Sequence, residues 1–312
     1  MKVFVLGATG VVGRRAVSRL VAAGHAVTGV ARTAEKEELL RRLGAIPVRV
    51  DIFDSGALHA AIQGHEAVVN LATHIPPVSK TMAAKNWATN DRIRREVSKN
   101  AVDAALAHGA TAYVQESITF PYVDSGAEWI SEDRERDFAP VMRSSADAEA
   151  QAARFGSDGR RGVVLRFSMF IAPDADHTRS FQSLLRWRIA PIFGAPEAFA
   201  SCIHADDAAT AVAAALRVPS GIYNVSEDRP LRRRELVDTM AARQGSGRPL
   251  MLPSWLAAAN GALVRVLMRS QRVSSAKFKG VSDWSPRHAS AVEGLSVSTE
   301  GGARSAGTVS AR

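Results

Sequence analysis

Short apolar runs alternate with longer amphipathic stretches through the first two-thirds of the chain. The apolar runs are rich in β-branched residues and predict strands that are buried on both faces, at residues 3–6, 27–31, 47–50, 67–71, 112–115 and 163–167. Helices are predicted between them, at residues 11–23, 35–43, 55–63, 91–108 and 145–155. Repeated strand–helix units of this kind predict an α/β fold with a Rossmann-type, doubly wound parallel sheet.

This alternation ends near residue 173. Helical patterns near 181–188, 206–216, 233–243 and 255–268 are then separated by connections that contain Pro and Gly. We therefore expect a Rossmann domain over 1–172 and a smaller, mainly helical substrate-side lobe over 173–295, with residues 222–225 returning as a strand to the main sheet. Residues 296–312 contain almost nothing apolar, which predicts a disordered tail.

The first predicted strand leads into a turn with three glycines, spaced three residues apart, before the first helix. Glycine allows a tight reversal, close approach of the backbone to a diphosphate, and close packing of the helix on the strand. The helix N-terminus adds free N–H groups and the positive end of its dipole. The turn therefore predicts a dinucleotide site formed by Gly7, Thr9, Gly10, Val11, Val12 and Gly13.

The amino-acid composition limits the kinds of binding partner that we expect. The 312 residues are 46% hydrophobic but contain no apolar run of about 18 residues, so we expect no membrane partner. One cysteine, Cys202, allows no internal disulfide and favours the cytoplasm. The formal charge of +9 comes mostly from scattered arginines without interleaved aromatics, so we expect a small-molecule substrate and no nucleic acid. Monomer and homodimer both remain open.

Further short motifs follow the glycine turn along the chain. They are Asp-Ile at 51–52, Asn-Leu-Ala at 70–72, Val-Leu-Arg-Phe at 164–167, His-Ala-Asp-Asp at 204–207 and Gly-Ile-Tyr-Asn-Val at 221–225. With these, residues 1–295 resemble the extended short-chain dehydrogenase/reductase superfamily of the NAD-dependent epimerase/dehydratase type. The resemblance implies a nicotinamide cofactor along the carboxyl edge of the sheet, with the substrate between that edge and the smaller lobe.

The residues after the second predicted strand bear on the choice of cofactor. An acid there would accept from the 2′-hydroxyl of NAD, whereas this chain has Arg32, followed by Thr33. Arginine suits a 2′-phosphate, so NADP(H) is preferred over NAD(H). Arg14 is a second candidate for the phosphate, or it is simply solvated. By resemblance, Asp51 would accept from the adenine amino group and the Ile52 backbone would meet the ring; alternatively, Asp51 only ends a strand.

The resemblance also implies the nicotinamide side of the site. Leu71, Ala72 and Thr73 leave the fourth predicted strand where the nicotinamide ribose should pass. Phe167 and Phe170, which delimit the segment after the sixth predicted strand, would line the nicotinamide pocket.

The catalytic positions depart from the family. Its hydride chemistry uses a Tyr followed four residues later by Lys, with a Ser upstream, and the alignment puts Val141 and Ser145 where the pair should be. The tyrosines of the chain are Tyr113, Tyr122 and Tyr223, and none has Lys four residues later. Ser117 occupies the position of the family's serine, and Tyr122 is the leading proton donor. Glu116, His74 and a water held by Ser117 are weaker donors, and Tyr122 packing as a loop aromatic is the alternative.

These residues predict an NAD(P)-dependent oxidoreductase that acts on a carbonyl or hydroxyl group of a small organic molecule, with an atypical active site. Two alternatives remain. One is a non-redox isomerase, dehydratase or cyclase on the same scaffold, and the other is a non-catalytic protein that senses NADP(H).

No metal site is predicted. In the motif at 204–207, which begins with His204, Asp206 or Asp207 is expected to cap a helix. A helical apolar stripe is expected to form the core of the smaller lobe or, alternatively, the wall of an apolar substrate pocket; it consists of Trp255, Leu256, Leu263, Val264 and Leu267.

Overall fold

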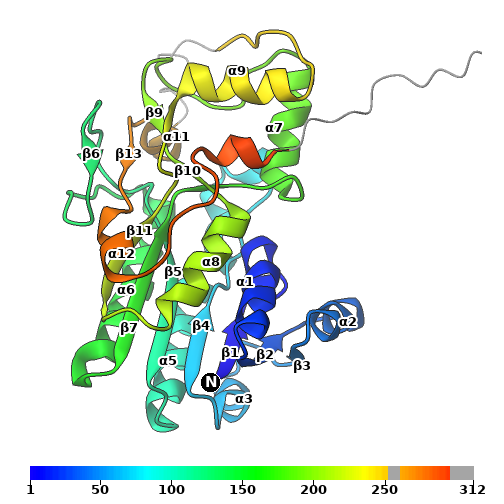
Figure 1. Cartoon of the computed structure of the whole chain (residues 1–312), viewed down its shortest axis with the longest axis vertical. Coiled ribbons are helices and arrows are strands. Elements are labelled where there is room, and N and C mark those ends of the chain that lie inside the picture. The colour runs from blue at the N-terminus through cyan, green and yellow to red at the C-terminus, as the bar shows by residue number, and fades with distance from the viewer. Residues whose placement is uncertain (252–260, 296–312) are drawn as a thin grey trace, which may run out of the picture.

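A parallel sheet of seven strands forms the centre of the molecule (Figure 1). The computed structural model describes residues 1–251 and 261–295. The strand order is β11-β7-β5-β4-β1-β2-β3, and all the neighbours pair in parallel. The strands are β1 (Lys2–Leu6), β2 (Ala26–Val30), β3 (Ile46–Val48), β4 (Ala67–Asn70), β5 (Ala112–Ile118), β7 (Arg161–Phe167) and β11 (Gly221–Val225). This topology confirms the α/β, Rossmann-type fold class.

Helices cover both faces of this sheet (Figure 1). One face packs against α1 (Val11–Ala22) and α8 (Ala205–Ala215), and the other against α3 (Ser55–Ile62), α5 (Ser98–Ala107) and α6 (Ser144–Phe155). Alternate side chains of β1 divide between the two cores, Val3 and Val5 in one and Phe4 and Leu6 in the other. Since both faces are covered, the strands are apolar throughout rather than alternating. Helix α2 (Ala34–Arg42) follows β2 near the edge of the sheet.

Two elements differ from the prediction at the carboxyl edge of the sheet. The single helix expected over 91–108 consists of α4 (Ala88–Arg92), a π-helical turn η3 (Ile93–Val97) and α5. Strand β5 continues three residues beyond the expected end, through Glu116, Ser117 and Ile118. Apolar periodicity missed this extension because Glu116 and Ser117 are polar, although both are buried.

The chain after residue 173 contributes to two regions. Strand β11 returns to the main sheet beside β7, as expected for residues 222–225, and α8 packs near α1. The smaller lobe (upper part of Figure 1) contains α7 (Asp176–Arg186), α9 (Arg233–Arg243) and α11 (Ala262–Leu267). Trp255, Leu256 and the expected tail at 296–312 lie outside the described residues.

Short elements complete the fold. They are β6 (Trp129–Ile130), η4 (Pro140–Met142), β8 (Met169–Ile171), β9 (Phe199–Ala200), β10 (Cys202–His204), β12 (Leu231–Arg232), β13 (Arg272–Val273), α12 (Ala276–Val281) and η6 (Ala291–Gly294). Over the ranges that the structure covers, none of the helices has both the length and the apolar character needed to cross a membrane.

Candidate active site

The glycine turn lies between β1 and the N-terminus of α1. A Cβ atom on Gly7, whose φ is +72°, would lie 2.5 Å from the carbonyl carbon and oxygen of Leu71. On Gly13 it would lie 2.0 Å from the carbonyl oxygen of Gly7. Gly10 is the N-cap of α1, and no side chain of the described residues accepts a hydrogen bond from the first N–H groups of this helix. The turn therefore holds the backbone tightly and leaves the first N–H groups of α1 available, which fits a dinucleotide diphosphate.

Other residues of this turn differ in exposure. Thr9 and Val11 are half-buried, while Val12 packs in the core beside the sheet. The structure therefore brings together all the residues predicted for the diphosphate, and Val12 serves packing.

Two arginines follow the glycine turn on α1 and form ion pairs. Arg15 Nη2 lies 2.9 Å from Asp174 Oδ1, and Arg15 Nε lies 2.6 Å from Asp206 Oδ1. Arg14 also pairs with Asp174, so it is not simply solvated. Burial acts to raise the pKa of Asp174, but the hydrogen bonds and charges of both arginines outweigh it and lower that pKa. These pairs tie α1 to α8 and to the loop before α7.

On the adenosine side, Arg32 is exposed after β2 and forms no ion pair with any residue that the structure describes. Thr33 caps α2, where its hydroxyl accepts the N–H of Lys36 at 3.4 Å. Asp51 is exposed, and its Oδ1 accepts the N–H of Phe53 at 3.0 Å. Because β3 ends at Val48, the alternative that Asp51 ends a strand is wrong. Arg32 is thus free to meet a phosphate.

The nicotinamide-side residues line up along the carboxyl edge of the sheet. Leu71 and Ala72 are buried after β4, whereas Thr73 is exposed. Phe167 is only 1% exposed and belongs to the main core. Its ring centroid lies 5.2 Å from that of Phe170, which is half-buried. Of these two rings, Phe170 therefore has the accessible surface and Phe167 supports it from behind.

Both predicted catalytic hydroxyls belong to one buried polar network. The Ser117 hydroxyl donates to Glu149 Oε1 at 2.6 Å, and the Tyr122 hydroxyl donates to Asn224 Oδ1 at 2.8 Å. Arg166 joins them, because its Nε donates to the same Glu149 oxygen at 2.9 Å and its Nη1 donates to the Tyr122 hydroxyl at 2.8 Å. The network therefore links β5, β7, β11 and α6.

Burial and charge decide the protonation of this network. Burial raises the pKa of Tyr122, although the charge of Arg166 opposes it. Burial also acts to raise the pKa of Glu149, but the hydrogen bonds and charge of Arg166 outweigh it and lower that pKa. Ser117 and Tyr122 are fully buried. Their hydroxyls thus have partners within the protein, and their catalytic role stays a prediction.

The alignment positions of the family's Tyr and Lys contain no proton donor that faces outward. Ser145 is buried, and its hydroxyl donates to the carbonyl of Met142 at 2.7 Å. Val141 belongs to an apolar patch around η4 and α11. We define the apolar patch as the half-buried residues Ile118, Phe120, Phe138, Val141, Leu263 and Leu267, which pack on the buried Ala139, Met142 and Val266. Leu263 and Leu267 of the predicted stripe therefore lie at this patch.

A charged pair lies at the same edge of the sheet. Arg94 Nη2 donates to both carboxylate oxygens of Glu116, at 3.0 and 3.2 Å. The sequence pattern predicts Glu116 only as a weaker donor, and Arg94 is not among the predicted site residues. The available signal was an arginine on the inward face of a helix that is otherwise apolar there, next to Ile93 and Val97. His74, another weaker candidate, is exposed.

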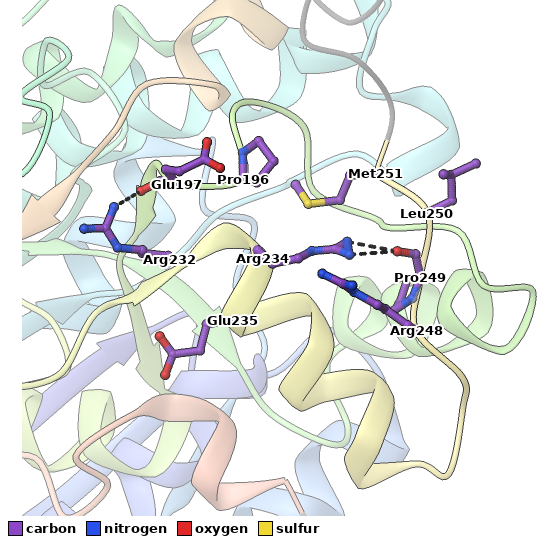
Figure 2. A pocket seen from close by; sticks show the side chains of 9 residues that line it. All are labelled: Pro196, Glu197, Arg232, Arg234, Glu235, Arg248, Pro249, Leu250 and Met251. Atoms are coloured by element: carbon purple, nitrogen blue, oxygen red, sulfur yellow. Dashed lines mark hydrogen bonds between the residues drawn. The ribbon is translucent and has the colours of Figure 1, made fainter.

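A cleft of about 660 Å³ opens beside the N-terminal end of α9 (Figure 2). It is lined by Pro196, Glu197, Arg232, Arg234, Glu235, Arg248, Pro249, Leu250 and Met251. Arg232 donates to the carbonyl of Glu197 at 2.6 Å, and Arg234 donates to that of Pro249 at 2.9 Å. These bonds hold the cleft's own loops together, and Arg248 pairs with Asp238 at 3.7 Å, so all three of its arginines already have partners.

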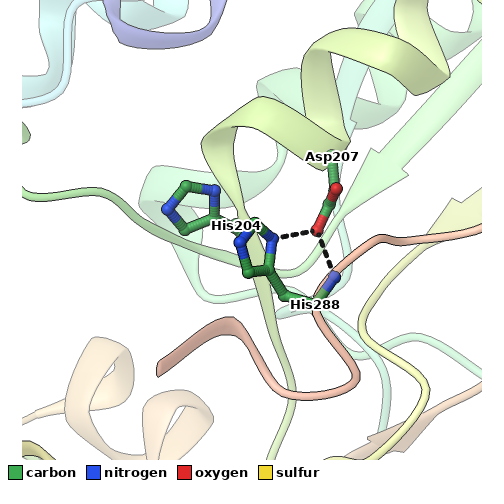
Figure 3. A group of neighbouring side chains, drawn as sticks. All are labelled: His204, Asp207 and His288. Carbon is green, nitrogen blue, oxygen red and sulfur yellow. Dashed lines mark hydrogen bonds and ion pairs between the residues drawn. The ribbon is translucent and has the colours of Figure 1, made fainter. Parts of the chain in front are cut away.

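His204, Asp207 and His288 form a third group, with ligand-type atoms within 4.8 Å of one another (Figure 3). Asp207 accepts from the backbone N–H and the Nδ1 of His288, at 3.1 and 2.8 Å. His204 Nδ1 caps α8 by accepting the N–H of Asp206 at 3.3 Å. A Cβ on Gly294 would lie 2.6 Å from His204 Nε2 and 3.0 Å from His288 Nε2. We infer that these contacts hold residues 287–294 against the start of α8.

The prediction that Asp206 or Asp207 caps α8 was wrong. The carboxylate of Asp206 turns to Arg15, and that of Asp207 turns to the backbone N–H groups of Arg287 and His288. His204 therefore caps the helix instead. Its ring nitrogen was missed because His is not among the usual N-cap residues.

The chain matches one protein family and is similar to several known proteins. A family model described as NAD(P)H-binding matches residues 7–170. A Streptomyces protein named 3-diazoavenalumate denitrifying reductase is 29% identical over 310 residues, which cover 95% of this chain and 99% of that protein. A chloroplastic epimerase family protein SDR39U1 homolog from Arabidopsis thaliana is 26% identical over 282 residues, covering 86% of this chain and 76% of that protein.

Solved structures share the fold. The human epimerase family protein SDR39U1 (isoform 2), solved with NADPH, superposes with a TM-score of 0.78 at 22% identity, covering 95% of this chain and 98% of that one. A UDP-glucose 4-epimerase from Thermotoga maritima, solved with UDP-glucose, gives a TM-score of 0.76 at 19% identity, covering 95% and 97%. At these identities the likeness establishes the architecture.

Proposed function

The chain belongs to the NAD(P)H-binding family, within the atypical, epimerase-type part of the short-chain dehydrogenase/reductase superfamily, and from this premise we propose that it is an NADPH-dependent reductase of a small organic molecule. The observation that carries the proposal is the glycine turn, whose Gly7 and Gly13 leave no room for a Cβ and whose helix N–H groups are capped by no side chain of the described residues. The full-length likeness to a protein named a reductase supports the direction of the reaction.

The cofactor of this family is NAD(P)(H), and it supplies a hydride when bound. We assign the diphosphate to the glycine turn and the 2′-phosphate to Arg32, which is exposed after β2 and lacks an acidic partner among the described residues. Thr33 would contribute its backbone, since its hydroxyl caps α2. Asp51 and Ile52 would meet the adenine, and residues 71–73 together with Phe170 would flank the nicotinamide side.

The apolar patch limits the chemistry. A carbonyl needs a proton on its oxygen as the hydride arrives, and such a proton usually comes from a positioned side chain. Val141 stands at the position of the family's Tyr, and the hydroxyls of Ser117 and Tyr122 are buried with protein partners. The site therefore favours an electrophile that accepts a hydride without proton transfer to oxygen.

A diazonium-bearing arene is such an electrophile. The hydride forms a new C–H bond at the ring carbon, the C–N bond breaks, and its electron pair leaves with N₂, so charge balances without an added proton. The Streptomyces relative is named for a diazo substrate and for denitrification, which supports this class. We therefore propose aryl diazo compounds as the first substrates to test, with carbonyl compounds as the alternative.

The test mixes the full chain with NADPH that carries deuterium at both C4 positions, and with 4-carboxybenzenediazonium or benzaldehyde. We expect one deuterium in the benzoate for each NADPH consumed, above the rate without protein. Deuterium in benzyl alcohol would instead support a carbonyl reductase. Tight NADPH binding with no label transfer to either compound would contradict the reductase and favour a sensor, and a rearranged product with no net NADPH loss would favour an isomerase.

A further inference from the structure

The buried pair Arg94–Glu116 lies where two adjacent strands end. Asn70, the last residue of β4, pairs in register with Gln115, so Glu116 lies just beyond the end of β4 on the carboxyl edge. Arg94 reaches it from the π-helical turn η3, a type of helical distortion that is frequent at functional sites. Arg94 is 2% exposed and Glu116 is 6% exposed. The pair thus occupies the edge at which ligands bind in open α/β sheets.

The helix that carries Arg94 also faces the segment assigned to the nicotinamide side. Asn90 lies one turn before Arg94, and its Oδ1 accepts the backbone N–H of His74 at 2.9 Å. His74 follows directly on Thr73, the last residue of that segment. Residues four apart share one face of a helix, so Asn90 and Arg94 are both directed toward this side of the sheet.

The guanidinium of Arg94 is used on one nitrogen only. Its Nη2 donates to both oxygens of Glu116, while its Nε is buried, and neither Nε nor Nη1 has a hydrogen bond to the described residues. The amide nitrogen of Asn90 is also buried and has no partner within the described ranges. A buried donor without an acceptor destabilises the folded state, so donors gathered on one face indicate a place for an acceptor.

We propose that Arg94, held in place by Glu116, binds an anionic oxygen of the substrate, a carboxylate or phenolate, beside the nicotinamide; this inference rests on the proposed reductase function. The guanidinium keeps its charge at all working pH values, and its Nε–H and Nη1–H remain as donors for an anionic oxygen. Ile118 lies two residues beyond Glu116 and so on the same face of β5, where it begins the apolar patch. The substrate is therefore a small aromatic acid or phenol, with its charge at Arg94 and its ring along Ile118 and Val141.

Arg94 acts here as a binding and orienting group. Arginine does not give up its proton in proteins, so it cannot serve as the acid of the reaction. Glu116 is a positioning residue, because both of its oxygens are held by Arg94. This division explains how the site can orient a substrate without the family's Tyr and Lys.

The test titrates trans-cinnamate into the complex of the full chain with NADPH, by calorimetry. We expect Arg94→Met to weaken cinnamate binding at least about tenfold, a loss of about 1.4 kcal/mol or more, while the NADPH dissociation constant changes less than about threefold. Arg95→Met is the matched control, because Arg95 is exposed and bonds Asp147 on α6. The cinnamate dissociation constant of this control should stay within about twofold of the wild-type value. Neutral cinnamamide should bind weakly to wild type and to every variant.

A second variant is needed in case Arg94→Met does not fold, since this substitution leaves the buried carboxylate of Glu116 unpaired. The double variant Arg94→Met with Glu116→Gln removes both charges, and it should also lose cinnamate binding. Equal cinnamate affinity in wild type and the double variant would overturn the inference, as would a wild-type NADPH complex that binds neither cinnamate nor 4-nitrophenolate. Failure to bind NADPH at all would instead overturn the proposed function.

Discussion

Among single residues, Tyr122 has a hydroxyl that the sequence predicts as a proton donor and that the fold uses in hydrogen bonds within the protein. It follows the carboxyl end of β5, where the family's catalytic groups lie, and this position made it the leading proton donor. In the structure its hydroxyl donates to Asn224 and accepts from Arg166. Such long-range partners, 102 and 44 residues away, leave no local signal in the sequence.

Tyr122→Phe separates the two roles. Loss of the hydroxyl leaves Asn224 and Arg166 each short of a partner, so we expect the free energy of unfolding in urea to fall by about 1–3 kcal/mol. We expect turnover of the folded enzyme to change by less than about tenfold, because the hydroxyl is buried. Tyr223→Phe serves as the control, since its hydroxyl donates to the Pro219 carbonyl away from the network. A tenfold or larger loss of turnover with unchanged stability would instead support Tyr122 as the proton donor.

Arg32 carries the preference for NADPH. Arg32→Asp replaces a cation that can bind the 2′-phosphate with an acid that suits the 2′-hydroxyl. We expect NADPH affinity to fall at least about tenfold while NADH affinity changes little or improves, measured by calorimetry. Arg42→Asp makes the same charge change at the far end of α2 and should affect both cofactors equally. Equal weakening of both cofactors by Arg32→Asp would remove Arg32 from the ribose site.

At the scale of elements, the glycine turn is the part that the sequence predicts best. Its spacing, its place after a strand and the conformation of Gly7 all agree with the observed close approach to Leu71. The break of helix 91–108 into α4, η3 and α5 was not predictable in the same way. The apolar positions in η3 and α5 continue the helical pattern, and the π-helical turn shows only when Arg94 is seen to reach Glu116.

Gly13→Ala tests this turn. The new Cβ would lie 2.0 Å from the carbonyl oxygen of Gly7, so the first turn of α1 must move away from β1. We expect the free energy of unfolding to fall by about 1–3 kcal/mol or more, as at other overpacked sites. The fraction of the variant that still folds should no longer bind NADPH. Gly280→Ala is the control, because a Cβ there meets nothing within 4 Å. NADPH binding and stability like those of wild type in Gly13→Ala would show that the turn is not tightly packed.

At the scale of the whole molecule, ion pairs connect the cofactor turn with the later part of the chain. Arg15 on α1 reaches Asp206 at the start of α8, and both Arg14 and Arg15 reach Asp174. The strand pattern predicted the return of residues 222–225 to the sheet. The ion pairs escaped prediction because they join residues about 160 to 190 positions apart, and a charged residue on a helix reads as solvated until its partner is known. The sequence therefore predicts the scaffold well and the polar contacts of the site poorly.

Calorimetric titration of the folded full chain with NADPH and NADH tests whether the glycine turn and Arg32 form an NADPH site. We expect saturable one-to-one binding of NADPH, at least about tenfold tighter than that of NADH, because the glycine turn receives the diphosphate and Arg32 receives the 2′-phosphate. No heat of binding with either nucleotide, in protein whose unfolding is cooperative, would contradict it.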